Sequence, residues 1–199
     1  MQISALSAYL FPILGYLSGS LPFALWVTNL VKGIDIRDGG SGHVTTTNTI
    51  RQAGLGWGIL VLILDIGKGF APTYFAARLG LPNWAVALTA GLAVLGHCWP
   101  LFAQFRGGMG LATTGGCLLA IQPLGFVIAL GVLVSLTLAL RHSARAALFT
   151  GLLIPVALWL LAQRGLIIWV SVASGMVVAV RFLDDWNREY RELWLDREQ

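Results

Sequence analysis

The stretch Asp38-Gly-Gly-Ser-Gly-His-Val-Thr-Thr-Thr-Asn-Thr-Ile-Arg51 lies between two long apolar segments and differs in composition from both. The preceding segment, residues 4–30, contains no charged side chain, and the following one, residues 55–77, contains only Asp65 and Lys68. Each segment is long enough to cross the hydrocarbon core of a bilayer as a helix. A polar connection between two such spans predicts a helical membrane protein.

The composition of the whole chain agrees with this first pattern. Of its 199 residues, 57% are hydrophobic and 11% are charged, and the mean hydropathy is +0.77, far above that of a soluble domain. We therefore expect an all-α, polytopic membrane protein that forms one integral-membrane domain over residues 1–199. About seven transmembrane helices are expected, at residues 4–30, 55–77, 84–105, 111–121, 124–140, 146–163 and 166–180. The fourth is close to the lower limit for a span, so a tilted or re-entrant segment is an alternative there.

The distribution of cations predicts the orientation. If the first helix starts outside, one set of loops and the C-terminal tail collect most of the lysines and arginines, and only Arg78 and Arg164 lie opposite. By the positive-inside rule the cation-rich loops and the C-terminus are cytoplasmic, in the plasma (inner) membrane. Residues 181–199 carry Trp186 and three further large side chains at helical spacing, which predicts a cytoplasmic amphipathic tail on the membrane lipids.

The composition also argues against two classes of function. The cations are strung along loops and are not gathered on one face with aromatic side chains, so we expect no nucleic-acid partner. Cys98 and Cys117 lie in apolar surroundings without metal-ligand spacing, so we expect no metal site and interpret both as inert packing residues.

The polar stretch between the first two spans is rich in groups that bind phosphate. Its glycines, hydroxyl side chains and Arg51 supply backbone N–H groups, O–H donors and a permanent cation. A phosphate-handling loop is one interpretation of this composition. A flexible connector between helices is the other, because Gly and Thr are ordinary loop residues.

Two further motifs place polar groups inside or next to the spans. Asp65 and Lys68 are three residues apart and share a helix face, as a functional site or as a structural ion pair. Such charges also suit a small transporter, although the chain is short for one and shows no inverted repeat. The run Phe105-Arg-Gly-Gly-Met-Gly-Leu-Ala-Thr113 places a glycine-rich turn before an apolar helix, where N–H groups attract anions. His97 precedes it and alone would more often be a packing histidine.

Taken together, these motifs resemble the bacterial acyl-phosphate:glycerol-3-phosphate acyltransferases, which are small membrane enzymes with seven helices. The resemblance covers nearly the whole chain, and the order and spacing of the motifs are jointly specific. They are Gly19-Ser-Leu-Pro-Phe23, Lys32-Gly-Ile-Asp-Ile-Arg37, Gly40-Ser-Gly42 with Thr47-Asn48 and Arg51, Asp65-x-x-Lys68-Gly69, Gly96-His97 with Pro100, and Phe105-x-Gly-Gly-x-Gly-x-Ala-Thr113.

The resemblance implies a reaction and a set of site residues. The reaction is transfer of a long-chain acyl group from acyl phosphate to the 1-hydroxyl of glycerol-3-phosphate, giving lysophosphatidate for phospholipid synthesis. It implies no cofactor, and the enzyme that forms the acyl phosphate is a candidate partner. The implied catalytic residues are Ser41, Arg51 and His97, of which the first two would hold substrate phosphate. The implied substrate-binding residues are Gly40, Gly42, Thr47, Asn48, Lys68, Gly107, Gly108, Gly110 and Asn187.

Several positions depart from the family pattern. In the motif Gly-Ser-Gly-Asn-x-Gly-Ala-Thr-Asn, this chain has His43 for the first asparagine and Thr45 for the next glycine. The lysine of the family motif Gly-Gly-Lys-Gly is Met109 here, so a cation for phosphate is missing, although Arg145 could supply one. The C-terminal motif is reduced to Asn187 and an arginine out of register. These departures leave two alternatives: a weak or inactive paralogue that binds lipid or acyl phosphate, and an enzyme that uses another acceptor.

Overall fold

A computed structural model of the chain describes residues 5–188, and in that range every regular element is helical. The all-α expectation is therefore confirmed. The helices are α1 (Ala5–Gly19), α2 (Phe23–Lys32), η1 (Ile36–Asp38), α3 (Thr46–Ala53), α4 (Leu55–Arg78), α5 (Asn83–Cys98), η2 (Leu101–Ala103), α6 (Leu111–Ile121), α7 (Pro123–Leu140), α8 (Ser143–Leu160) and α9 (Leu166–Leu183).

Six segments of the described chain are long and apolar enough to cross a membrane. They are Leu6–Lys32, Leu55–Arg78, Asn83–Ala103, Pro123–Leu140, Ser143–Leu160 and Leu166–Leu183. The expected fourth helix, α6, has the predicted bounds but only 11 residues, a rise of about 16 Å at 1.5 Å per residue. That is about half the thickness of the hydrocarbon core, so the count of seven spanning helices is not confirmed.

The expected first helix is broken in two, because α1 ends at Gly19 and α2 begins at Phe23. Pro22 has no backbone N–H and its ring disfavours the helical conformation of the residue before it, so the helix ends there. The break frees the carbonyl of Leu21 inside an apolar bundle. Lys68 of α4 donates a hydrogen bond from Nζ to this carbonyl at 2.9 Å, and its ammonium lies 5.6 Å from the centre of the Phe23 ring. The interrupted backbone is thereby satisfied by a neighbouring helix.

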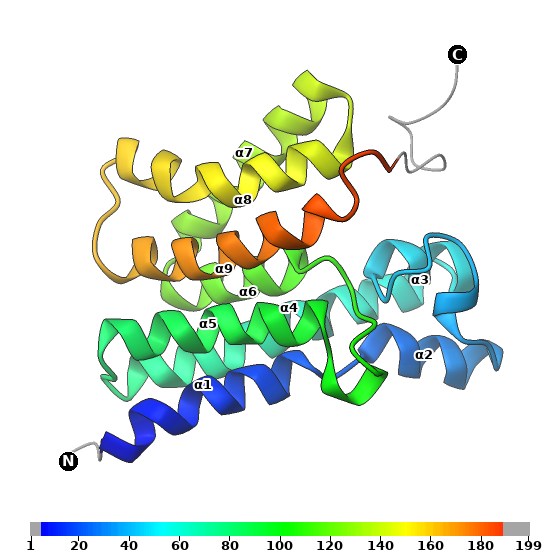
Figure 1. The fold of residues 1–199 in the computed structure, drawn as a ribbon, viewed down its shortest axis with the longest axis horizontal. Helices are drawn as coiled ribbons and strands as arrows, with labels where there is room; N and C mark the ends of the chain where they lie inside the picture. Colours follow the sequence, from blue (N-terminus) through cyan, green and yellow to red (C-terminus); the bar gives the residue numbers. More distant parts are fainter. Residues whose placement is uncertain (1–4, 189–199) are drawn as a thin grey trace.

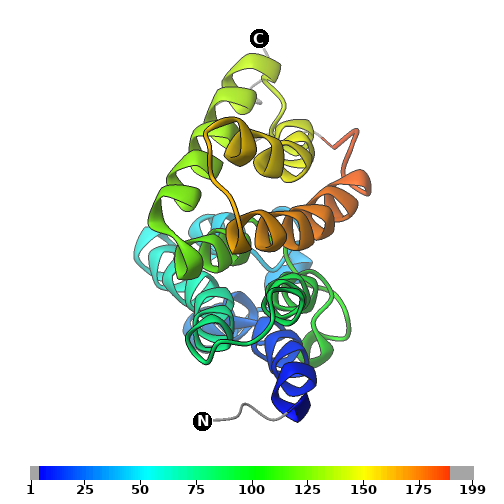
Figure 2. The ribbon, with the colours of Figure 1, turned by 90° about the vertical axis from the view of Figure 1, so that its left-hand side faces the viewer.

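The helices pack in a chain of neighbours, with α1 on α5, α5 on α9 and α9 on α8, while α4 packs on α6. Figure 2 shows α7 along the outside of this arrangement, and α7 is the most exposed of the long apolar helices. Glycine permits the closest approaches: a Cβ on Gly19 would collide with the carbonyl oxygen of Ala93, and Gly151 and Gly175 face each other across α8 and α9 in the same way. These contacts show how small residues draw membrane helices together.

Polar segments collect at one end of the bundle. In Figure 1 the start of α1 and the turns between α4 and α5 and between α8 and α9 lie on the left, whereas α2, α3 and the end of α9 lie on the right. The expected polar loop, residues 38–51, ends at Thr45, and its remaining residues belong to α3. Thr45 caps this helix by accepting a hydrogen bond from the N–H of Asn48, and Gly54, with φ of 100°, ends it.

The expected amphipathic tail is only partly described. Residues 181–183 are the last turn of α9, and residues 184–187 form a turn, so the part of the tail that the structure describes does not continue as a helix beyond Leu183. Tyr190, Leu193 and Trp194, which carried the expected helical spacing, lie outside the described residues. Within residues 181–188, the chain instead approaches the loop that carries Ser41.

Candidate active site

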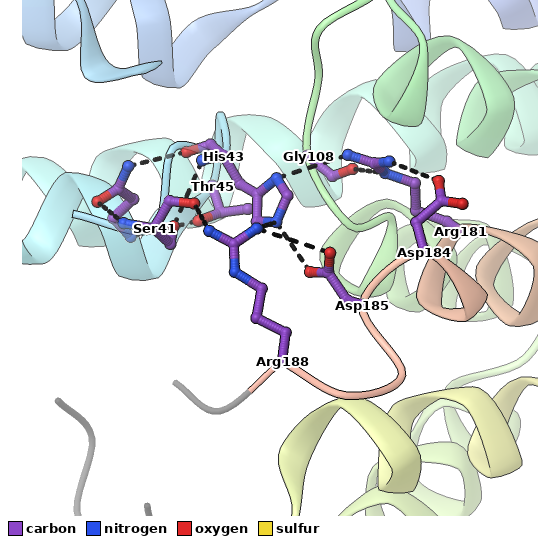
Figure 3. Close-up of polar contacts among 9 residues, drawn as sticks. Ser41, His43, Thr45, Gly108, Arg181, Asp184, Asp185 and Arg188 are labelled. Carbon is purple, nitrogen blue, oxygen red and sulfur yellow. Dashed lines mark hydrogen bonds and ion pairs between the residues drawn. The ribbon is translucent and has the colours of Figure 1, made fainter. Parts of the chain in front are cut away.

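Three polar segments distant in the sequence meet at the right-hand end of the bundle in Figure 1. They are the loop before α3, the glycine-rich turn before α6, and the turn after α9. Figure 3 shows Ser41 and His43 from the first segment, Gly108 from the second, and Arg181, Asp185 and Arg188 from the third. A backbone hydrogen bond of 3.3 Å from the N–H of Val44 to the carbonyl of Gly107 joins the first two segments directly.

The side chain of Asn48 fixes the loop around Ser41 by hydrogen bonds to its backbone. Its side chain is fully buried, and Nδ2 lies within hydrogen-bond distance of the carbonyls of Ile36, Gly39 and His43, at 3.0, 3.2 and 3.0 Å. Its Oδ1 accepts a hydrogen bond of 3.2 Å from the N–H of Ser41. The family resemblance implies that Asn48 binds substrate. The structure shows an amide whose donors and acceptor are directed at the loop backbone, which suits a positioning role.

The loop itself brings Ser41 to a nearly buried position. Gly40 and Gly42, on either side, have φ of 59° and 71°, in the left-handed region that glycine adopts without strain. A Cβ on Gly40 would collide with Oδ1 of Asn48, so the tight path of the loop depends on glycine there. Ser41 is 8% exposed, and its hydroxyl oxygen lies 3.4 Å from the N–H of His43, at the long end of a hydrogen bond.

An ion pair fastens the start of the same loop. Arg37 donates to both carboxylate oxygens of Asp35, with Nη2 to Oδ2 at 2.6 Å, and its Nη1 donates to the carbonyl of Ala103 in η2 at 3.2 Å. The hydrogen bonds from the Arg37 side chain lower the pKa of the Asp35 carboxyl and raise the pKa of the Arg37 guanidinium. The pair therefore stays charged and links the Ser41 loop to the segment before the glycine-rich turn.

The glycine-rich turn lies directly against His97. The N–H of Gly108 donates a hydrogen bond of 3.0 Å to the His97 carbonyl, and a Cβ on Gly108 would collide with Nε2 of the imidazole and with the carbonyl of Val44. Gly110, with φ of 84°, then begins α6 without a side-chain cap. In the first turn of α6 the hydroxyl groups of Thr113 and Thr114 are buried and, among the described residues, have no hydrogen-bond partner. This helix end therefore retains donors that could hold an anion.

Asp65, Lys68 and His97 form a buried polar cluster next to the turn. Oδ1 of Asp65 lies 2.8 Å from Nζ of Lys68 and 3.6 Å from Nδ1 of His97, and each of the three side chains is at most 6% exposed. The expected shared helix face is thus confirmed. Lys68 donates to the Leu21 carbonyl and pairs with Asp65, so its ammonium stabilises the backbone at the break between α1 and α2. That geometry favours the structural interpretation of the pair.

A second polar cluster was not anticipated from the sequence. Nε2 of His43 lies 2.8 Å from Oδ2 of Asp185, and Nδ1 lies 3.5 Å from Nη2 of Arg181. Arg188 also approaches Nε2, at 2.9 Å, and donates to the carbonyl of Ser41. If the imidazole is neutral with its proton on Nε2, it donates to Asp185 and accepts from Arg181. Nη1 of Arg188 cannot then donate to Nε2, and its nearby acceptor is Oδ1 of Asp185, 3.6 Å away.

The remaining candidate residues lie around these clusters. Thr47 and Arg51 are partly buried on α3, directly after the Ser41 loop. Asn187 is exposed in the turn after α9, where its neighbours Asp185 and Arg188, rather than Asn187, make the recorded contacts with the loop. Met109 is 7% exposed and belongs to the main apolar core. Within residues 5–188, no three His, Cys, Asp or Glu side chains are grouped so that they could hold a metal ion.

Comparison with known proteins gives one consistent result. A family model described as glycerol-3-phosphate acyltransferase matches residues 9–192. The chain belongs to this family. Glycerol-3-phosphate acyltransferases from Thermotoga petrophila and Rubrobacter xylanophilus are 42% and 37% identical to it, over 86% and 85% of this chain and 84% of each relative. "Glycerol-3-phosphate acyltransferase 2" of Bacillus cereus is 39% identical over 86% of both chains.

Two solved structures of an integral membrane acyltransferase of this kind also resemble the chain. They are PlsY (YgiH) in its glycerol 3-phosphate form, with a TM-score of 0.80 and 32% identity, and in its lysophosphatidic acid form, with a TM-score of 0.79 and 31% identity. Each covers 92% of this chain and 91% of the solved chain. This acyltransferase is therefore a multi-pass membrane protein, as the composition predicted.

Sequence reasoning identified part of the candidate site. It found the Ser41 loop and the glycine-rich turn, which the structure brings together. It missed Arg181, Asp185 and Arg188, because charged residues after a last span fit a tail on the membrane surface equally well. The one available signal was His43 itself, since a histidine in place of the family asparagine requires new polar partners somewhere in the fold.

Proposed function

We propose that this protein transfers a long-chain acyl group from acyl phosphate to the 1-hydroxyl of glycerol-3-phosphate, forming lysophosphatidate. The observation that carries the proposal is the contact between the Ser41 loop and the glycine-rich turn, above the buried His97 and at one end of an apolar bundle. A polar, cation-rich site next to membrane-spanning helices suits a reaction between a soluble phosphate ester and a lipid-like donor. Membership of the family supports the same reaction.

The reaction makes modest chemical demands on the protein. A bond forms between the acceptor oxygen and the acyl carbon, and the bond from that carbon to the phosphate oxygen breaks. Because the acyl phosphate is already activated, the protein needs mainly to align the hydroxyl with the carbonyl carbon and to stabilise charge on the departing phosphate. The departing phosphate can take up the proton that the acceptor hydroxyl loses.

The side chains would divide these tasks. Ser41 and Arg51 would hold substrate phosphate, and the uncapped start of α6 at Gly110 would add backbone donors. His97 would keep the glycine-rich turn in position through its contacts with Gly108. The acyl chain would lie against the apolar helices, and the polar substrate would enter from the cytoplasm, with the protein in the plasma membrane.

Lysophosphatidate formation tests the proposal. Purified protein incubated with labelled glycerol-3-phosphate and palmitoyl phosphate should yield labelled lysophosphatidate. Ser41→Ala and Arg51→Ala should each lower kcat/KM by about 30-fold, equivalent to about 2 kcal/mol for a lost charge-assisted or oxyanion contact.

Matched controls lie far from the site. Ser135→Ala removes an exposed hydroxyl on the outer helix α7, and Arg78→Ala removes a cation at the end of α4, opposite the site. Both variants should retain wild-type kcat/KM. Binding of palmitoyl phosphate without any product would contradict the proposal and indicate a paralogue that binds without turnover. Wild-type activity in both Ser41→Ala and Arg51→Ala would show that the site is elsewhere.

A further inference from the structure

Arg181 lies where the two motif loops come together. It is the single cation of α9 and lies in the last turn, and its side chain is 13% exposed. Nε donates a hydrogen bond of 3.0 Å to the carbonyl of Gly108, and Nη2 lies 3.5 Å from Nδ1 of His43 (Figure 3). The guanidinium carbon is 5.6 Å from the centre of the Trp99 ring, which supports it from another side. One cation thus touches both the glycine-rich turn and the Ser41 loop.

The charge of Arg181 is only weakly compensated. Its partners Gly108 and His43 offer a carbonyl oxygen and a ring nitrogen, and neither group carries a negative charge. Its recorded carboxylate partner, Asp184, is 3.2 Å from Nη1 but has a side chain that is 65% exposed, so water screens much of that attraction. The buried carboxylate of Asp185, by contrast, is 2.8 Å from His43 and 3.6 Å from Arg188. A partly buried positive charge therefore remains at the junction of the two loops.

The guanidinium also keeps donors for a ligand. An arginine has five N–H groups, and the recorded contacts to Gly108, Asp184 and His43 use three of them, which leaves two. Arginine forms paired hydrogen bonds with phosphate oxygens when its plane is held in one orientation, and Trp99 and Gly108 hold it here.

The residue at position 109 explains why a phosphate site here needs a cation from elsewhere in the chain. Met109 has no charge, and it is buried in the apolar core directly after Gly108, the residue that Arg181 contacts. We propose that Arg181 binds the phosphate of glycerol-3-phosphate and so supplies the charge that position 109 lacks. This inference rests on the proposed acyl transfer. It assigns Arg181 to the acceptor phosphate, and not to the phosphate of the acyl donor.

Steady-state kinetics of Arg181→Gln test the assignment. The KM for glycerol-3-phosphate should rise by roughly tenfold or more, as expected for a lost charge-assisted contact, while kcat at saturating acceptor stays within about threefold. The KM for palmitoyl phosphate and the turnover of glycerol, an uncharged acceptor, should not change. Arg181→Lys should recover part of the affinity, because it restores the charge without the planar pair of donors.

The control is Arg78→Gln, which removes an exposed cation at the end of α4, opposite the site, and should leave every parameter at its wild-type value. An unchanged KM for glycerol-3-phosphate in Arg181→Gln would overturn the inference. A rise in the KM for palmitoyl phosphate alone would also overturn it. An equal loss of turnover with glycerol-3-phosphate and with glycerol would show a merely structural role and would overturn it as well.

A binding measurement separates this inference from the proposed function. Glycerol-3-phosphate, but not glycerol, should raise the unfolding temperature of the detergent-purified wild-type protein, and it should fail to do so in Arg181→Gln. If the wild type makes no lysophosphatidate, the proposed function fails. The inference about Arg181 then fails only if glycerol-3-phosphate stabilises the wild type and Arg181→Gln equally, or stabilises neither.

Discussion

At the scale of single residues, Asn48 determines whether the Ser41 loop keeps its shape. Asn48→Ala would remove the acceptor for the N–H of Ser41 and one donor to the His43 carbonyl, which keeps the N–H of Thr45. Leaving a buried N–H such as that of Ser41 without a partner costs about 1–3 kcal/mol. We expect Asn48→Ala to lower both the unfolding temperature and kcat/KM, measured by thermal unfolding and by lysophosphatidate formation.

Two further single-residue variants test whether the amide of Asn48 is required. Asn48→Asp keeps an acceptor for Ser41 but turns a carboxylate oxygen toward backbone carbonyls, so it should be at least as damaging as Asn48→Ala. Gln52→Ala removes hydrogen bonds only to the carbonyls of Ile36 and Gly39, which Asn48 also contacts, and should cost less than either. Full activity in Asn48→Asp would contradict a positioning role for this amide.

At the scale of elements, the break between α1 and α2 depends on the charged pair in α4. Lys68→Met would leave the Leu21 carbonyl with only the N–H of Phe23 as a donor, and Asp65 as a buried charge without its cation. Removing one partner of a buried ion pair costs about 3–5 kcal/mol, because the remaining charge stays desolvated. The unfolding temperature of Lys68→Met in detergent should therefore fall strongly.

The double variant Asp65→Asn/Lys68→Met distinguishes a structural pair from a catalytic one. It removes both charges, so it should be more stable than Lys68→Met alone and should recover measurable lysophosphatidate formation. A double variant that folds as stably as wild type but makes no product would show that Lys68 acts on substrate, as the family resemblance implies.

At the scale of the whole molecule, the motif loops should all lie on one side of the membrane. Cysteines introduced by Asp38→Cys and Arg141→Cys should react with a membrane-impermeant maleimide only from the cytoplasmic side, and a cysteine from Asn83→Cys only from outside. All three positions are exposed, and the native Cys98 and Cys117 are buried, so background labelling should be low. Labelling of Asp38→Cys and Asn83→Cys from the same side would contradict this arrangement of helices.

The sequence by itself determined the class of fold, the positions of the long helices and two of the polar segments that form the candidate site. Long apolar runs identify spans because only a helix satisfies its own backbone inside lipid, and the bounds of α6 follow from glycine and proline at its ends. The same reasoning could not show that the first span is interrupted. A proline permits a kink or a break, and the choice depends on whether another helix, here through Lys68, supplies the missing hydrogen bond.

Only the tertiary structure decided which polar groups meet. His43 and Asp185 are 142 residues apart, and Arg181 lies 73 residues from Gly108, so no local pattern links them. Their contacts arise because α5 packs on α9 and α8 on α9, which brings the end of α9 to the loops before α3 and α6. Local sequence thus set which segments are polar, and the packing of the helices set which of those segments share one site.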